Sequence, residues 1–154
     1  MDDGQVRERV RLVYEASCKR LWQSVLGFSG STDVADEAVS EAFAQVLRRG
    51  SEVRDVEAWV WRTAFKIAAG ELAGRRRTED RLPQVSAEMP EQTVDLVAAL
   101  AELPDSDREL LVLRHVPGFT PAELSELLNV RAATLRVRLH RASKRAKPIL
   151  EKLR

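Results

Sequence analysis

Apolar side chains recur every three or four residues along most of this chain, and the alternating pattern of a β-strand is almost absent. One such stretch ends near Gly27, a second near Gly50, and a third runs from about Asp55 to about Gly74. Four shorter helical patterns follow in the second half of the chain. This spacing predicts an all-α protein of two small helical domains, the first with three helices and the second with four.

Residues that commonly cap helices support these boundaries. A Ser-Thr-Asp run at residues 31–33 can cap the second helix, and Gly50 can end it. Asp105 or Ser106 is expected to cap the helix that carries the apolar run 110–113.

Residues 78–92 carry no helical period and combine prolines with mixed charges. We interpret them as a linker between a domain at 1–77 and a domain at 93–154. An ordered loop within one domain is the alternative.

The net charge of +1 predicts no particular partner, but the charges are unevenly placed. Residues 131–154 are strongly basic, with Glu151 as their only acid, and a second basic cluster lies at Arg75–Arg77. The stretch between 88 and 109 is acidic. This asymmetry predicts local contacts with a polyanion, although a basic face that is merely solvated is the plain alternative.

Several classes of protein are disfavoured. Cys18 is the only cysteine, which excludes an internal disulfide and suits a small core residue in a reducing compartment. The sequence has neither an N-terminal signal segment nor an apolar run of about 18 residues, so we expect a cytoplasmic protein without membrane insertion. It has no Gly-rich phosphate loop, no metal-ligand spacing and no nucleophile–base set. We therefore expect no enzyme, no cofactor and no metal site.

The stretch "FTPAELSELLNVRAATLRVRLHRASKR" predicts a helix-turn-helix. Thr120 can cap its first helix, with Pro121 at the first helical position and Glu123 completing a capping box. Asn129 stands where the chain needs a left-handed backbone residue, and a second helix starts about three residues later.

In the second helix Leu135, Leu139 and Ala142 are spaced to face the first helix, and the small Ser125 permits a close crossing. The remaining positions are the candidate DNA-binding residues: Arg131, Thr134, Arg136, Val137, Arg138, Arg141, Lys144 and Arg145. In a DNA major groove the arginines could reach guanine edges or phosphates, and Thr134 and Val137 could meet thymine methyls. A helical hairpin with a solvated basic face is the alternative.

The segment "LAELPDSDRELLVLRHVPGFTPAELSELLNVRAATLRVRLHRASKR" resembles region 4 of bacterial sigma factors, including the closing "RLHRA" at residues 138–142. "VADEAVSEAFAQVL" and "EAWVWRTAFKIAAGELAGRRR" are similar, less faithfully, to sigma region 2. The second of these keeps Trp59 and Arg62, whereas Lys66 replaces the usual asparagine and Gly70 the usual aspartate. The compact layout resembles that of extracytoplasmic-function (ECF) sigma factors.

The resemblance implies a promoter-specificity subunit of RNA polymerase. Region 4 would read the minus-35 element as duplex and contact the polymerase flap. Region 2 would bind the clamp helices of the polymerase core through the candidates Asp36, Glu37, Glu41, Phe43 and Leu47. It would open and hold the minus-10 element through Trp61, Arg62, Lys66, Arg75, Arg76 and Arg77. An anti-sigma partner is usual in the family, although nothing in the sequence identifies one.

Two tryptophans near the start of the third helix have different expected roles. Trp59 follows the apolar period and is expected in the core, whereas Trp61 lies off that face and is the candidate for stacking on an unpaired base. A linker of 15 extended residues would reach about 50 Å. Together with two small domains, such a linker could span the distance between promoter elements two duplex turns apart, which is about 70 Å.

The departures from the family pattern, at Lys66, Gly70, Ala133 and Val137, leave a second hypothesis open. It is a sigma-like regulator that binds DNA or a partner protein without itself directing polymerase.

Overall fold

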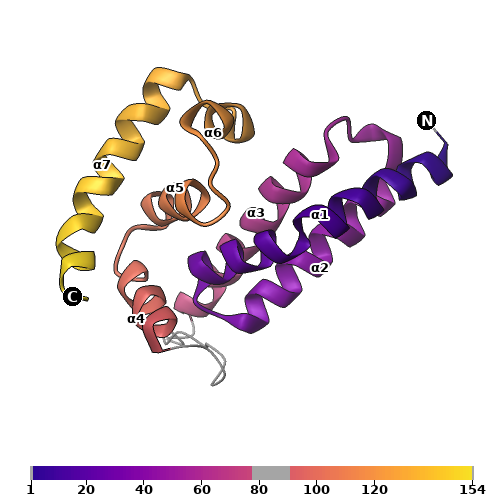
Figure 1. Ribbon diagram of the computed structural model, residues 1–154. Coiled ribbons are helices and arrows are strands. Elements are labelled where there is room, and N and C mark those ends of the chain that lie inside the picture. Colours follow the sequence, from indigo (N-terminus) through magenta and orange to yellow (C-terminus); the bar gives the residue numbers. More distant parts are fainter. Residues whose placement is uncertain (1, 78–90, 154) are drawn as a thin grey trace.

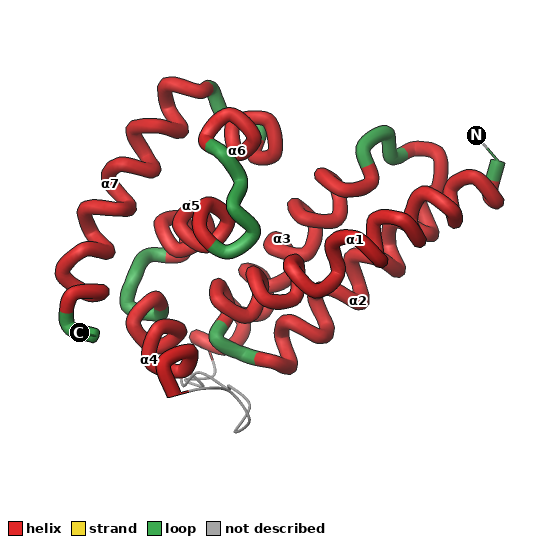
Figure 2. Tube along the Cα trace, in the orientation of Figure 1, coloured by secondary structure: helices red, strands yellow, loops and turns green. Residues whose placement is uncertain are grey.

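The computed structural model describes residues 2–77 and 91–153, which form seven α-helices and one short 3-10 helix with no β-strand among them (Figures 1 and 2). The prediction of an all-α protein is confirmed. Of the linker predicted at 78–92, residues 78–90 lie outside the described part, and Glu91 and Gln92 already belong to a helix. None of the described helices is long and apolar enough to cross a membrane.

Three long helices pack side by side in the first half of the chain (Figure 1). They are α1 (Asp3–Ser29), α2 (Thr32–Arg49) and α3 (Val56–Arg77), with the 3-10 turn η1 (Gly50–Glu52) between the last two. Ser31 caps α2 by accepting from the backbone N–H of Val34 at 3.2 Å, and Gly50 ends it with a φ of 62°. Both agree with the sequence expectation. The first helix, however, continues past Gly27 and ends only at Gly30, which has a φ of 69°.

The second half forms four shorter helices: α4 (Glu91–Leu100), α5 (Asp105–His115), α6 (Pro121–Leu128) and α7 (Ala132–Glu151). The capping box of α6 is present as predicted, with Thr120 and Glu123 each accepting from the other's backbone N–H, at 3.1 and 3.0 Å. The expected cap of α5 is wrong. Pro104 occupies the N-cap without a side-chain hydrogen bond, and the Asp105 carboxylate instead accepts from Arg108 at 2.9 Å because that guanidinium is buried beside it.

A continuous buried core runs through both halves of the described chain. It joins the first bundle to the second because α1 packs on α4 and α5, and α3 packs on α6. Leu21 and Val60 are fully buried in the first bundle, as Leu113, Leu124 and Leu135 are in the second. Cys18 is partly buried against this core, as the sequence indicated.

Candidate nucleic-acid interface

The turn between α6 and α7 is fixed by its own hydrogen bonds. Asn129 has φ 54° and ψ 48°. Among the residues that the structure describes, it is the only one other than glycine with a positive φ. The backbone N–H of Val130 donates to the carbonyl of Ser125 at 3.0 Å, and the Ser125 hydroxyl donates to the carbonyl of Val130 at 2.5 Å. Ser125 therefore does more than allow a close crossing, because it ties the end of α6 to the start of α7.

The inner stripe of α7 is the predicted one, with Leu135 and Ala142 fully buried and Leu139 partly buried against the core. The candidate DNA-binding residues of α7 are all exposed: Arg131, Thr134, Arg136, Val137, Arg138, Arg141, Lys144 and Arg145. Figure 1 shows α7 at the edge of the molecule, with α5 and α6 between it and the first bundle. This basic face is therefore open, and two hydrogen bonds hold the turn that precedes it.

One flank of α7 borders a groove against α5. Arg138, Arg141 and Arg145 line this groove together with the acidic residues Asp107 and Glu109. Arg145 donates from Nη1 to Asp107 Oδ2 at 2.7 Å, and the Asp107 side chain is buried. Burial, followed by the negative charge of Asp105, raises the pKa of the Glu109 carboxyl above its ordinary value. Arg145 is thus both a candidate DNA contact and an anchor of the helix.

The expectation that Trp61 lies on an exposed face of α3 is wrong for this arrangement of the chain. Trp61 is only 1% exposed. Its ring stacks on Phe65 with centroids 6.5 Å apart and meets the edge of Phe119, from the second bundle, at 5.0 Å. Its buried Nε1 has no hydrogen-bond partner among the described residues. The periodicity of α3 located the face that meets α1 and α2, but it could not indicate that the second bundle covers another face.

Trp59 is partly buried against the core, as expected, and the guanidinium of Arg49 lies 5.8 Å from its ring centroid. The position of Trp59 gives no reason to assign it a contact with DNA.

The cationic candidates on α3 are dispersed rather than gathered. Arg62 is exposed but donates from Nη1 to the carbonyl of Leu127, at the end of α6, at 3.3 Å. Lys66 is exposed. Arg75 is partly buried and donates to the Ser31 hydroxyl at 3.2 Å. Arg76 and Arg77 belong to α3, but their side chains lie outside the described part.

The polymerase-binding candidates on α2 divide into surface and core. Asp36 is exposed and accepts from the indole N–H of Trp22 at 2.7 Å, and Glu37 is also exposed. Phe43 is 6% exposed, and its ring meets that of Tyr14 in a T-shaped contact with centroids 5.0 Å apart, so it packs mainly in the core. Its aromatic ring fills the space between α1 and α2.

Glu41 and Leu47 are the remaining candidates on α2. Arg48 donates to the Glu41 carboxylate at 2.8 Å and Gln45 donates to it at 3.1 Å. These bonds hold the pKa of Glu41 below its ordinary value, and the bond from Arg48 has the larger effect. Leu47 is 49% exposed, although its place in the apolar period would suggest burial.

An apolar groove between α1 and α2 is a feature that the sequence reasoning missed. Its floor includes Phe43 and Ala44, and its rim includes Leu47 and the half-exposed Tyr14. Tyr14 lies among the apolar positions of α1 in the sequence, yet its side chain is half-exposed. The exposed fraction of its ring could not be read from that pattern.

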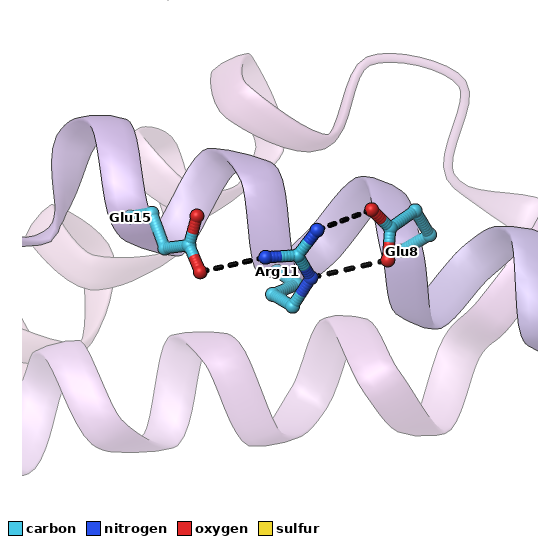
Figure 3. A network of polar contacts seen from close by, with 3 residues as sticks. All are labelled: Glu8, Arg11 and Glu15. Carbon is cyan, nitrogen blue, oxygen red and sulfur yellow. Dashed lines mark hydrogen bonds and ion pairs between the residues drawn. The ribbon is translucent and has the colours of Figure 1, made fainter.

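Arg11, which also lines the groove, is held by two carboxylates on its own helix (Figure 3). It pairs with Glu8 one turn before it and with Glu15 one turn after it, the latter at 2.7 Å. The bonds that Arg11 donates to Glu8 and Glu15 raise the pKa of Arg11, and the bond to Glu8 lowers the pKa of that carboxyl. This network fixes a charged border beside the apolar groove.

Comparison with known proteins decides the family. The sigma-70 region 4 family matches residues 93–145, which is most of the second bundle. The chain is 31% identical over 139 residues to the ECF RNA polymerase sigma factor ShbA of Streptomyces griseus, and the match covers 77% of this chain and 71% of that protein. The chain belongs to the ECF RNA polymerase sigma factors.

Other relatives of this sigma factor agree. It is 28% identical over 150 residues to the ECF RNA polymerase sigma factor SigE of Mycolicibacterium smegmatis, a match that covers 86% of this chain and 58% of that protein. The fold is similar to that of CnrH, solved in complex with the cytosolic domain of CnrY, with a TM-score of 0.77 at 16% identity. That similarity covers 97% of this chain and 92% of CnrH.

The fold is also similar to that of the sigma factor RpoE, solved with the anti-sigma factor NepR from Bartonella quintana, with a TM-score of 0.67 at 19% identity. That similarity covers 94% of this chain and 96% of RpoE. The sequence relatives confirm the family resemblance inferred from the motifs, and the solved structures share the fold. A sigma factor directs RNA polymerase in transcription initiation and is not itself an enzyme, and this sigma factor shares that function.

Proposed function

We propose that this sigma factor brings core RNA polymerase to promoters whose minus-35 element is read, as duplex, by the exposed face of α7. The observation that carries the proposal is the fixed turn at Asn129 followed by a helix whose basic side chains are all open to solvent. A helix-turn-helix places its second helix in the major groove, while its first helix crosses the DNA backbone.

The side chains of α7 suit two kinds of contact. Arg138 and Arg141 could donate to guanine edges, and Thr134 and Val137 could contact thymine methyls. The other cationic residues, Arg131, Arg136, Lys144 and Arg145, would neutralise phosphates and contribute affinity that falls as salt rises.

In the first bundle, we assign minus-10 contacts to the cationic residues of α3. Lys66 is exposed, and Arg75 to Arg77 are the last residues of the same helix. Trp61 could take part only if the second bundle moved away, since Phe119 covers it. Arg62 is exposed and would exchange its bond to the carbonyl of Leu127 for one to DNA.

We assign contact with the polymerase clamp to the outer side of α2 and the neighbouring apolar groove. Leu47 and Tyr14 expose apolar surface there, with Asp36 and Glu37 exposed further along the helix. An apolar centre with a charged border is the usual composition of a protein interface. The second bundle would contact the flap. An anti-sigma partner is a further proposal, supported by RpoE, which was solved with the anti-sigma factor NepR.

The test is reconstitution with core polymerase. The purified protein should form a stable complex with core polymerase. Sequencing of the genomic DNA that this complex binds identifies candidate promoters, and fragments that carry them should give promoter-specific run-off transcripts. A protein that binds DNA but forms no complex with core would be the sigma-like regulator instead.

A further inference from the structure

The groove between α5 and α7 has an acidic wall opposite a basic one. Arg138, Arg141 and Arg145 are three and four residues apart, so they share one flank of the recognition helix. Asp107 and Glu109 line the same groove from α5. Negative charge beside a surface that binds a polyanion weakens the attraction between them. The acidic wall is therefore not what affinity for DNA alone would require.

Asp107 is a fixed anion. Its side chain is 9% exposed, and it is the third residue of α5, where the positive end of the helix dipole stabilises a carboxylate. Arg145 donates to it across 2.7 Å, while the Arg145 side chain remains 58% exposed. The guanidinium thus faces solvent with its charge already matched by a buried neighbour.

Arg145 differs in this respect from the other cations assigned to phosphates. In the part of the chain that the structure describes, Arg131, Arg136 and Lys144 form no ion pair with an acid. Those three bring their full charge to DNA, whereas Arg145 brings a charge that Asp107 already offsets. The recognition helix is therefore less cationic toward DNA than its sequence suggests.

The position of Arg145 along α7 decides which group of DNA it can meet. It lies about 20 Å from Ala132, the first residue of the helix, at a rise of about 1.5 Å per residue. The N-terminal residues of a recognition helix meet base edges, so the group left within reach of Arg145 is a phosphate. A phosphate contact carries no sequence information, and an uncompensated charge at Arg145 would strengthen binding to DNA of any sequence.

We propose that Asp107 is a specificity-determining residue of the sigma factor, which offsets the charge of Arg145 and so limits the affinity of α7 for DNA of any sequence. Specificity is a difference between affinities, and an element that weakens the wrong complexes raises it. This inference rests on the minus-35 contact proposed above and refines it. Arg145 can still donate a hydrogen bond to a phosphate, but the ion pair brings no net charge to the DNA.

The test is the salt dependence of binding of the full-length chain to short duplexes of random sequence. Asp107→Asn removes the negative charge and nearly preserves the shape of the side chain. It frees Arg145 to neutralise one further phosphate, so the slope of log K against log salt concentration should steepen by about 0.9. Affinity for random duplexes near 0.1 M salt should rise roughly fivefold, which follows from the same slope.

Binding to a promoter duplex, identified from the DNA bound by the complex with core polymerase, is the second measurement. Base contacts hold α7 in one register there, whereas on random DNA the helix can shift until the freed Arg145 meets a phosphate. Asp107→Asn should therefore raise the affinity for the promoter duplex less than the affinity for random duplexes. The ratio of the two affinities should fall.

Three matched variants isolate the ion pair. Asp107→Glu keeps the charge and should bind both kinds of duplex as the parent does. Asp95→Asn, on α4, removes an exposed carboxylate that does not line the groove and should leave the slope unchanged. Addition of Arg145→Gln to Asp107→Asn removes the freed cation and should return the slope to that of the parent. A general effect of lower negative charge would survive this addition.

The single variant Arg145→Gln tests the inference without altering the buried carboxylate. It should lower affinity without changing the slope, because the chain loses a hydrogen bond to phosphate but no phosphate-neutralising charge. A slope shallower by about 0.9 would overturn the inference.

An Asp107→Asn chain that is folded by circular dichroism would also overturn the inference if it kept the slope of the parent, bound random DNA more weakly, or gained equally on both duplexes. Each of these results would leave the proposed function intact. Equal affinity of the parent protein for promoter and random duplexes would instead overturn the proposed reading of the minus-35 element.

Discussion

Arg145 in α7 donates to Asp107 in α5 across 2.7 Å, and the carboxylate of this pair is buried while the guanidinium is largely exposed. The contact joins two helices that are distant in sequence and sets how the recognition helix lies on the second bundle. The sequence did not indicate this ion pair, since Asp107 belongs to an acidic stretch and Arg145 to a basic stretch far from it along the chain.

A double-mutant cycle on this pair measures its contribution. Asp107→Asn and Arg145→Ala should each lower the free energy of unfolding, and the coupling energy should be about 1 kcal/mol, because one partner is shielded from water. Urea unfolding of the two single variants and the double variant provides the values. Strictly additive effects would mean that the ion pair does not anchor α7.

Local features of the sequence predicted the fold well because their causes are local. The caps at Ser31 and Thr120 and the left-handed residue Asn129 all follow from the geometry of a few neighbouring residues. Trp61 was expected off the core-facing side of its helix but is buried, because burial depends on which second surface covers a helix. Its aromatic side chain fills a junction between helices instead.

The left-handed conformation of Asn129 predicts a graded response to substitution. Asn129→Gly should leave the free energy of unfolding almost unchanged, because glycine adopts this conformation without strain. Asn129→Ala should cost about 1–2 kcal/mol, because alanine keeps the β-carbon strain of this conformation without the local hydrogen bonding that lets asparagine adopt it. Asn129→Val should cost more, since its branched β-carbon adds to that strain. Urea unfolding of the three variants is the measurement. An alanine variant as stable as the glycine variant would contradict the account of the turn.

The division of α2 into core and surface predicts opposite behaviour for two neighbouring apolar residues. Phe43→Ala should destabilise the protein by about 3–5 kcal/mol because it empties a packed site. Leu47→Ala should change stability by less than about 0.5 kcal/mol, as a surface substitution does. It should nevertheless weaken the complex with core polymerase.

Thermal unfolding and a pull-down with tagged core separate these effects. If Leu47→Ala bound core as well as the parent protein, the assignment of the α1–α2 groove to the clamp would be wrong.

Glu109 predicts a pH dependence of stability. Burial raises the pKa of its carboxyl in the folded chain, so the folded state binds the proton more tightly than the unfolded state. Its contribution to stability is therefore fully present below the ordinary glutamate pKa of 4.5 and is lost as the pH rises through the raised value. Glu109→Gln should be more stable than the parent at neutral pH, with the advantage disappearing below about pH 4. Denaturant unfolding across this range tests the sign, and a variant that is less stable at neutral pH would contradict it.

The most direct test of the assigned recognition face is the affinity of the sigma factor for its minus-35 duplex, measured by fluorescence anisotropy at one fixed salt concentration. Arg138→Ala and Arg141→Ala should each weaken binding by about 1–3 kcal/mol if they read a base. The control is Lys147→Ala, which removes an exposed positive charge further along the same helix, at a residue to which no DNA contact is assigned. It should lose less affinity, and about equally on all DNA sequences. Unchanged affinity in both arginine variants, or losses no greater than that of Lys147→Ala, would contradict the claim that this face of α7 reads the promoter.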